Sequence, residues 1–189
     1  MPEIRGTNHY LTKKGLNWHH AAYLGIPDNH NVGFYIDYGS IPSDRNQLGV
    51  NIGKNNGNYR EIVVTPYVTN KNNPKYGQVI NNPTISDYIE TIKAEVPYQQ
   101  NSEFIIQSGT GDINYPMQLA EHDAYRDNRD KYNVLLKNCA TVASEMYNAG
   151  IDMSKNKPIG ESAFPHLNIR SNGWVPFLTH RISPEGGNL

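Results

Sequence analysis

Residues 132–150, which read YNVLLKNCATVASEMYNAG, decide both the fold and the chemistry predicted for this chain. Asn138 is a favourable residue to cap the start of a helix, and Gly150 is a favourable residue to end one. Between them, apolar side chains recur at helical spacing and predict a buried stripe: Val142, Ala143, Met146 and Tyr147. The pattern therefore predicts a helix with Cys139 in its first turn.

A cysteine in the first turn of a helix is predisposed to react. The thiolate is the nucleophilic form, and an ordinary thiol has a pKa of about 8.5. The positive end of the helix dipole lowers that pKa, and the amides of the first turn can hold an oxyanion. A lone cysteine is more often a small buried apolar residue, so position alone leaves a reactive and a structural Cys139 both open.

Two adjacent histidines near the N-terminus are candidate bases for this thiol. Residues 18–25 and 32–38 are rich in apolar and aromatic side chains and are separated by a Pro-Asp-Asn turn, which predicts an antiparallel hairpin. His19 and His20 both lie in the first strand. Because side chains alternate between the faces of a strand, only one of the two histidines can face Cys139.

Asp37, on the second strand, is a further polar side chain whose part in the chemistry the strand pattern leaves open. It shares a strand face with Tyr35. The opposite face carries the apolar residues Phe34, Ile36 and Tyr38 and is predicted to be the core side. Asp37 is then a polar residue on the face that is not visibly core. The alternative is a solvated carboxylate with no catalytic part.

The order of these segments resembles the circularly permuted branch of the NlpC/P60 superfamily of papain-like cysteine hydrolases, which includes the lecithin retinol acyltransferase-like proteins. The run HHAAYLG at 19–25 looks like the His-x-Ala-x-Tyr-x-Gly strand of that branch. The run YNVLLKNC at 132–139 closely resembles the segment that precedes its nucleophile. The resemblance covers roughly residues 16–40 and 100–150.

The resemblance implies a role for each matching residue. Cys139 would be the nucleophile, His19 its base, and Asp37 the group that fixes the imidazole. His20 stays open as the alternative base. Tyr23 and Asn138 are the candidate substrate-binding residues, and for Tyr23 the alternative is simple packing.

The remaining segments complete a predicted α+β domain over residues 1–189, with an antiparallel sheet of four to six strands packed against helices. They are an irregular N-terminal segment at 1–15, a surface loop at 40–58, strands at 62–68 and 103–107, helices at 86–96 and 117–130, and an irregular C-terminal segment at 160–189 that wraps the domain. Thr84 or Ser86 is expected to cap the first of these helices.

Composition argues against several classes of protein. The formal net charge is -1 and charges of one sign form no long run, so non-specific nucleic-acid binding is not expected. A single cysteine cannot form an intramolecular disulfide. No stretch approaches the roughly 20 apolar residues of a membrane span, and the N-terminus lacks the apolar region of a signal peptide. We therefore expect no stable membrane anchor, and either a cytoplasmic location, secretion by a non-classical route, or a domain of a longer chain.

No cofactor is expected for this chemistry. A zinc site built from His19, His20 and Cys139 is the metal alternative, but the spacing of these residues matches no familiar zinc motif.

The resemblance implies a cysteine hydrolase that cleaves an amide through an acyl-enzyme. The first expectation is a peptidoglycan-type amidase or endopeptidase, because many bacterial members cut such peptides. The run before Cys139 also looks like those of effector toxin domains, which would have an immunity protein as partner. The alternatives are a lipid acyltransferase or phospholipase and a catalytically silent binding module. The lipid alternative is weakened because Ala140-Thr141 stands where the lecithin retinol acyltransferase-like proteins usually carry Glu-His.

Overall fold

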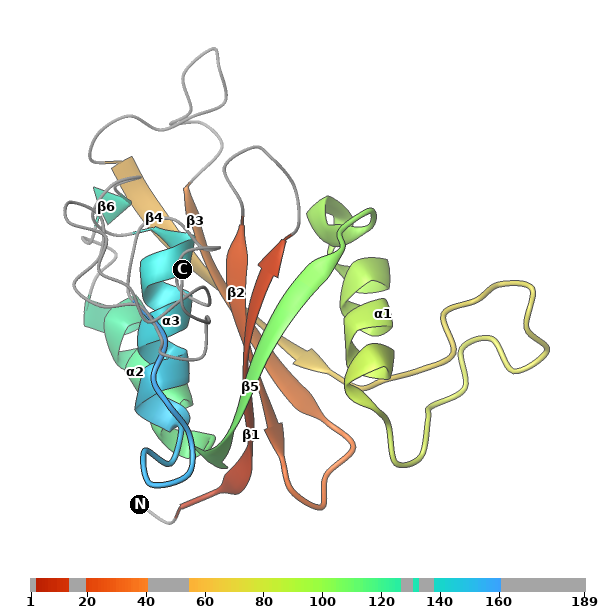
Figure 1. The fold of residues 1–189 in the computed structure, drawn as a ribbon. Coiled ribbons are helices and arrows are strands. Elements are labelled where there is room, and N and C mark those ends of the chain that lie inside the picture. Colours follow the sequence, from red (N-terminus) through yellow and green to blue (C-terminus); the bar gives the residue numbers. More distant parts are fainter. Residues whose placement is uncertain (1–2, 14–19, 41–54, 127–130, 133–137, 161–189) are drawn as a thin grey trace, which may run out of the picture.

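The computed structural model describes residues 3–13, 20–40, 55–126, 131–132 and 138–160. Five strands form an antiparallel sheet in the order β5-β1-β2-β3-β4 (Figure 1). They are β1 (Arg5–Lys13), β2 (Ala21–Pro27), β3 (Gly33–Ser40), β4 (Asn55–Val64) and β5 (Phe104–Asp112). The two-residue strand β6 (Lys131–Tyr132) pairs with the first residues of β4. The predicted α+β class with an antiparallel sheet is confirmed.

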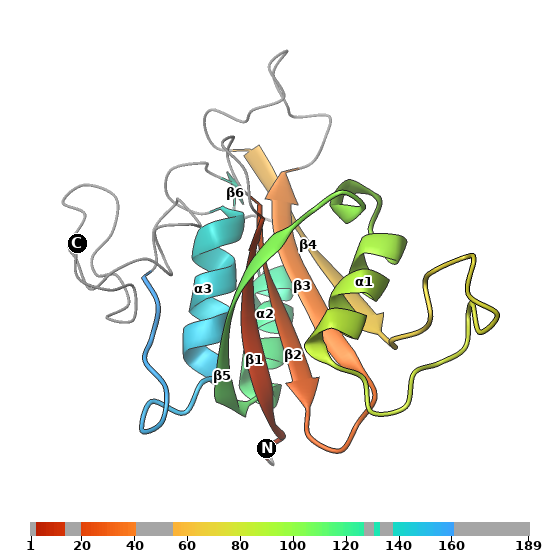
Figure 2. The same ribbon diagram turned by 45° about the vertical axis from the view of Figure 1, so that its right-hand side comes forward.

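Helices cover both faces of this sheet (Figures 1 and 2). α2 (Asn114–Arg126) and α3 (Cys139–Gly150) lie on one face. α1 (Ile85–Glu95) and the short 3-10 helix η2 (Pro97–Gln99) lie on the other. None of the helices in the described part of the chain combines the length and apolar character that a membrane span requires.

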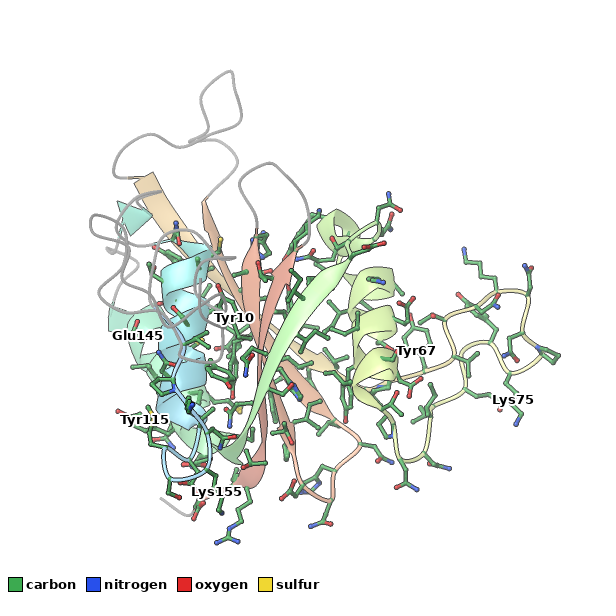
Figure 3. All side chains as sticks on the ribbon, in the orientation of Figure 1. Tyr10, Tyr67, Lys75, Tyr115, Glu145 and Lys155 are labelled. Carbon is green, nitrogen blue, oxygen red and sulfur yellow. The ribbon has the colours of Figure 1, made fainter. Side chains whose placement is uncertain are left out.

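The first of two cores lies between the sheet and α3. Tyr10 of β1 and Tyr23 of β2 pack there against Met146 and Tyr147 of α3. Figure 3 shows Tyr10 in this space, with Glu145 on the outer side of α3. The stripe predicted for the helix is buried in full: Val142, Ala143, Met146 and Tyr147. Burial of this face therefore attaches α3 to the middle of the sheet.

The second core lies between the sheet and α1. Leu24 and Tyr35 pack there with Tyr88 and Ile92 of α1. The prediction that Tyr35 and Asp37 share a face outside the core is wrong, because both side chains are at most 1% exposed. With both faces covered, alternation along β3 does not distinguish a core face from a solvent face.

The N-terminal residues form an inner strand, which corrects the irregular segment predicted at 1–15. β1 pairs with β2 on one side and with β5 on the other. Its buried side chains include Asn8 and His9, so the strand lacks a clean apolar alternation. Asn8 is accommodated because Tyr23 Oη donates to its Oδ1 at 2.5 Å, while its Nδ2 donates to the Gly150 carbonyl at 3.1 Å.

Two other strands differ in their bounds from the predicted ranges 62–68 and 103–107. β4 begins at Asn55, inside the loop predicted at 40–58. It ends at Val64, two residues before Pro66, which has no N–H to continue a ladder. β5 runs to Asp112, beyond the predicted end at 107, because its glycines stay in extended pairing with β1.

The helices agree more closely with prediction. Thr84 caps α1 by accepting from the Asp87 amide, and the Asp87 side chain accepts from the Thr84 amide at 2.7 Å. α2 is confirmed as a helix but starts three residues before the predicted 117. The C-terminal segment predicted at 160–189 lies outside the described residues beyond position 160.

His9 gives the fold a predicted acid sensitivity. It is 5% exposed, its Nδ1 lies 2.7 Å from Ser108 Oγ, and its Nε2 has no partner among the described residues. Burial lowers the pKa of His9 from 6.5 to about 4, so the unfolded chain binds a proton at this residue first as pH falls. The stability that His9 contributes is complete above pH 6.5 and is lost towards pH 4. The free energy of unfolding of the wild type is expected to fall between pH 7 and pH 5. In His9→Gln this fall is expected to be smaller by about 2 kcal/mol.

Urea unfolding of the wild type and of His9→Gln at the two pH values measures this difference. His30→Gln is the matched control, because His30 is exposed in the loop between β2 and β3. An equal pH dependence in all three proteins would contradict the prediction.

Candidate active site

Cys139 is the first residue of α3, and Asn138 caps the helix. Asn138 has an extended backbone, and its Oδ1 accepts from the amides of Ala140 at 2.8 Å and Thr141 at 3.2 Å. In return, Thr141 Oγ1 accepts from the Asn138 amide at 2.9 Å. This reciprocal capping box determines where α3 begins, so local sequence places Cys139 at the positive end of the helix dipole.

The start of α3 meets the start of β2. The His20 side chain and the Ala21 amide lie beside the Cys139 thiol, and both lower its pKa. His20 immediately precedes β2, and Ala21 is its first residue. Cys139 is 7% exposed, while the His20 side chain is 22% exposed. The thiol is therefore sheltered from bulk water, and the imidazole is the more open side of the pair.

The Asp37 carboxylate lies behind His20. Its Oδ2 is 3.4 Å from His20 Nε2, which is an ion-pair contact longer than a well-formed hydrogen bond. The strand register explains this contact. Asp37 pairs with Ala22, and His20 stands two residues before Ala22, which is the spacing of side chains on one strand face. Cys139, His20 and Asp37 thus form one chain of contacts.

Three further donors hold Asp37 in place. Tyr35 Oη donates to Oδ2 at 3.1 Å, and Tyr98 Oη donates to the same oxygen. Arg60 Nε donates to Oδ1 at 2.5 Å. Gln99 Nε2 in turn donates to Tyr35 Oη at 3.1 Å. A buried carboxylate is costly unless it is paired and hydrogen-bonded, and these contacts meet that need.

The electrostatics favour a charged thiol–imidazole pair. Burial alone raises the pKa of the Cys139 thiol, but His20 and the Ala21 amide stabilise the thiolate more, and the pKa falls below its ordinary value. Burial alone lowers the pKa of His20, but its contacts with Asp37 and Cys139 raise it to about 9. Burial raises the pKa of Asp37, and the nearby His20, Arg60 and Tyr98 reverse that shift. At neutral pH, these directions favour thiolate, imidazolium and carboxylate.

The predicted site residues differ in where the structure places them. Cys139 and Asp37 converge, with His20 between them. His19, the base implied by the family motif, lies outside the described residues, so that role stays a prediction. Tyr23 does not line the site: it is completely buried, with its hydroxyl on Asn8 near the other end of α3. Asn138 adjoins Cys139, but its side-chain oxygen is engaged in capping.

Sequence reasoning missed Arg60 and Tyr98. Arg60 directly faces Asp37 across β3 and β4, a pairing that only the strand register reveals. Arg60 also lies between the loop predicted at 40–58 and the strand predicted at 62–68, so the sequence pattern places it on no strand face. Tyr98 belongs to η2, a single 3-10 turn after α1 that carries no periodic signal.

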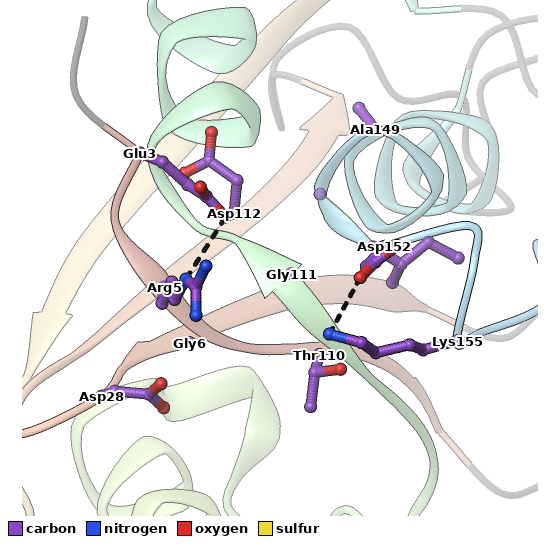
Figure 4. Close-up of a pocket in the computed structure, with 12 residues that line it drawn as sticks. Glu3, Arg5, Gly6, Asp28, Thr110, Gly111, Asp112, Ala149, Asp152 and Lys155 are labelled. Carbon is purple, nitrogen blue, oxygen red and sulfur yellow. Dashed lines mark ion pairs between the residues drawn. The ribbon is translucent and has the colours of Figure 1, made fainter.

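A pocket of about 610 Å³ lies at the far end of α3 from Cys139, about 16 Å along the helix axis (Figure 4). Charged side chains of both signs line it. Two of its cations are paired locally: Arg5 with Glu3 at 3.8 Å and Lys155 with Asp152 at 3.2 Å. The pocket contains no residue of the Cys139 site, so we assign it no part in the chemistry.

In the described ranges, no three His, Cys, Asp or Glu side chains are grouped so as to hold a metal ion. Comparison of the chain with known proteins found no matching family model, curated protein or solved structure.

Proposed function

We propose that this chain is a cysteine hydrolase of the permuted NlpC/P60 type, which cleaves an amide bond through an acyl-enzyme. The observation that carries the proposal is the contact of Cys139, at the positive end of α3, with His20, which is backed by Asp37. One hairpin supplies His20 and Asp37, and the distant helix α3 supplies Cys139. A nucleophile, a base and a group that orients the base are what nucleophilic catalysis by cysteine uses.

The proposed reaction starts from the Cys139 thiolate and the His20 imidazolium, because the thiol proton already resides on His20 at neutral pH. The thiolate attacks the substrate carbonyl carbon and forms a tetrahedral oxyanion, which the Cys139 amide stabilises. The amides of Ala140 and Thr141 bond to the Asn138 side chain. Collapse breaks the C–N bond, and His20 gives its proton to the departing amine. Water, deprotonated by His20, then releases the acid and restores the thiolate.

Asp37 would act through His20 rather than on substrate. Its carboxylate orients the imidazole and stabilises the imidazolium that forms when Cys139 loses its proton. The three donors on Asp37 hold it in one orientation, so this support is present before substrate binds.

The chain order supports the permuted arrangement. A histidine at the start of β2 comes first, an acid on the adjacent strand β3 follows, and the cysteine opens a later helix that packs on the same sheet. This is the order that the resemblance to the permuted branch implies. We propose a bacterial peptidoglycan-type amidase or endopeptidase, acting as a secreted antibacterial effector toxin with an immunity protein as partner.

The rate at which iodoacetamide alkylates Cys139, measured between about pH 4 and pH 9, tests the proposal. The chain has one cysteine, so every modified molecule reports on this site. We expect rapid labelling well below pH 8.5, the ordinary range of a thiol, and loss of that reactivity in His20→Ala. Slow labelling with an ordinary or raised pKa would mean a structural cysteine and would support the binding module instead.

Product analysis with muropeptides and with phospholipid vesicles tests the substrate class. Release of a peptide or amine from the muropeptides supports the amidase, whereas release of a fatty acid or lysophospholipid would support the lipid alternative. Cys139→Ser is the control for both reactions, because it removes the thiol and keeps a group of similar size.

A further inference from the structure

Arg60 stands at the end of the chain of contacts, and it exchanges no proton and forms no bond with substrate in the reaction described above. Its Nε lies 2.5 Å from Asp37 Oδ1, which is closer than His20 Nε2 comes to the other carboxylate oxygen at 3.4 Å. Asp37 is therefore held more closely by the guanidinium than by the imidazole. A carboxylate that only oriented His20 would be expected to lie closer to the imidazole than to the guanidinium.

Two neighbours, Tyr98 and Gly39, shape the position of Arg60. Its Cζ lies 4.6 Å from the centre of the Tyr98 ring, as in a cation–π contact. A Cβ at Gly39 would come within 2.5 Å of Nη2, so the missing side chain at Gly39 makes room for the guanidinium. The Tyr98 hydroxyl also donates to Asp37. Tyr98 therefore contacts both Arg60, through its ring, and the carboxylate that Arg60 binds.

The four charged groups alternate in sign along the contacts. In the active form, the Cys139 thiolate is followed by the His20 imidazolium, the Asp37 carboxylate and the Arg60 guanidinium. Without the last member, the buried carboxylate would be balanced by the imidazolium alone. His20 would then hold its proton more strongly, although it must release that proton to the leaving amine.

We propose that Arg60 is a positioning residue, which holds the Asp37 carboxylate through Nε and offsets its charge so that His20 can both accept and release a proton. The proposal rests on the proposed function for its catalytic meaning, but its structural claim concerns only Asp37 and His20. The groups that face Asp37 are Tyr35 on β3, Arg60 on β4, Tyr98 on η2 and His20 before β2. Cys139 of α3 joins them through His20.

Arg60→Gln tests the proposal with two readouts besides turnover. Loss of the positive charge makes the thiolate less stable, so the pH midpoint of Cys139 alkylation is expected to rise by about one unit. The pKa of His20, followed by NMR of its ring carbons, is expected to rise as well, because Asp37 is no longer offset. Arg60→Lys keeps the charge without the Nε geometry, and we expect a smaller rise in both readouts.

Arg5→Gln is the matched control, since it removes the same charge from an exposed residue at the other end of the molecule, beside Glu3. It is expected to move neither readout. A His20 pKa in Arg60→Gln equal to that of the wild type would overturn the proposal, and so would an equal shift in Arg5→Gln. If Arg60→Gln does not fold, the proposal is tested in Arg60→Lys instead, by the pH midpoint of Cys139 alkylation and by the pKa of His20. Wild-type labelling typical of an ordinary thiol would defeat the hydrolase proposal, while the His20 titration would still decide the role of Arg60.

Discussion

His20→Ala is expected to lower kcat/KM by about 10²- to 10⁴-fold, which is the usual contribution of a positioned general acid and base. The reason is that His20 is the described residue that contacts both the Cys139 thiol and the Asp37 carboxylate. Without it, the thiol has no acceptor for its proton and the thiolate has no cation beside it. The folded structure is expected to persist, because the His20 side chain is partly exposed and belongs to neither core. Turnover of the cleaved substrate, with circular dichroism to check folding, measures the effect.

His19→Ala is the matched comparison, because the two histidines are neighbours of identical chemistry. We expect a much smaller loss for His19→Ala than for His20→Ala, while Cys139→Ser should abolish turnover. The family motif implies the opposite order for the two histidines. Loss of turnover confined to His19→Ala would therefore move the base to His19 and leave His20 as a neighbour of the site.

Gly111→Ala is expected to lower the free energy of unfolding by about 3 kcal/mol, at the upper end of the range for overpacking. A Cβ at Gly111 would collide with the Gly150 carbonyl oxygen and lie 2.7 Å from the Asp152 amide nitrogen. Both are backbone atoms, and the latter is held by its own hydrogen bond to the Thr110 carbonyl at 2.8 Å. The obstacle therefore cannot rotate away as a flexible side chain would. Urea unfolding at pH 7 measures the change.

Gly77→Ala provides the control for this substitution. Gly77 has a φ of +79°, and a Cβ there would meet nothing within 4 Å. Its replacement is expected to cost about 1 kcal/mol, from backbone conformation alone. Equal stability of Gly111→Ala and the wild type would show that β5 and the end of α3 are packed less closely than described.

The helix that carries the nucleophile could be predicted from sequence because its determinants are local. They all lie within 12 residues of the start of α3: the Asn138 cap, the Thr141 side chain that accepts from the Asn138 amide, and the buried stripe. α1 could be predicted for the same reason, because its Thr84 cap immediately precedes it in the chain. Cys139 could accordingly be proposed as the nucleophile before any tertiary contact was known.

β1 and Arg60 could not be predicted in this way. β1 is an inner strand whose buried Asn8 is acceptable only because Tyr23 and Gly150 supply its hydrogen bonds. Arg60 belongs to the site only because it faces Asp37 across β3 and β4. Both facts depend on partners more than ten residues away in the chain.

The sequence by itself determined the α+β class, the Asn138-capped helix and the candidates Cys139 and Asp37. Capping bonds and apolar periodicity act over one or two turns of chain, so they can be read without knowing what packs against them. Only the tertiary structure decided that Asp37 is buried, and that His20 and Arg60 are its partners. The physical reason is strand register: a shift of one residue exchanges the two faces of a strand, and long-range pairing sets that register.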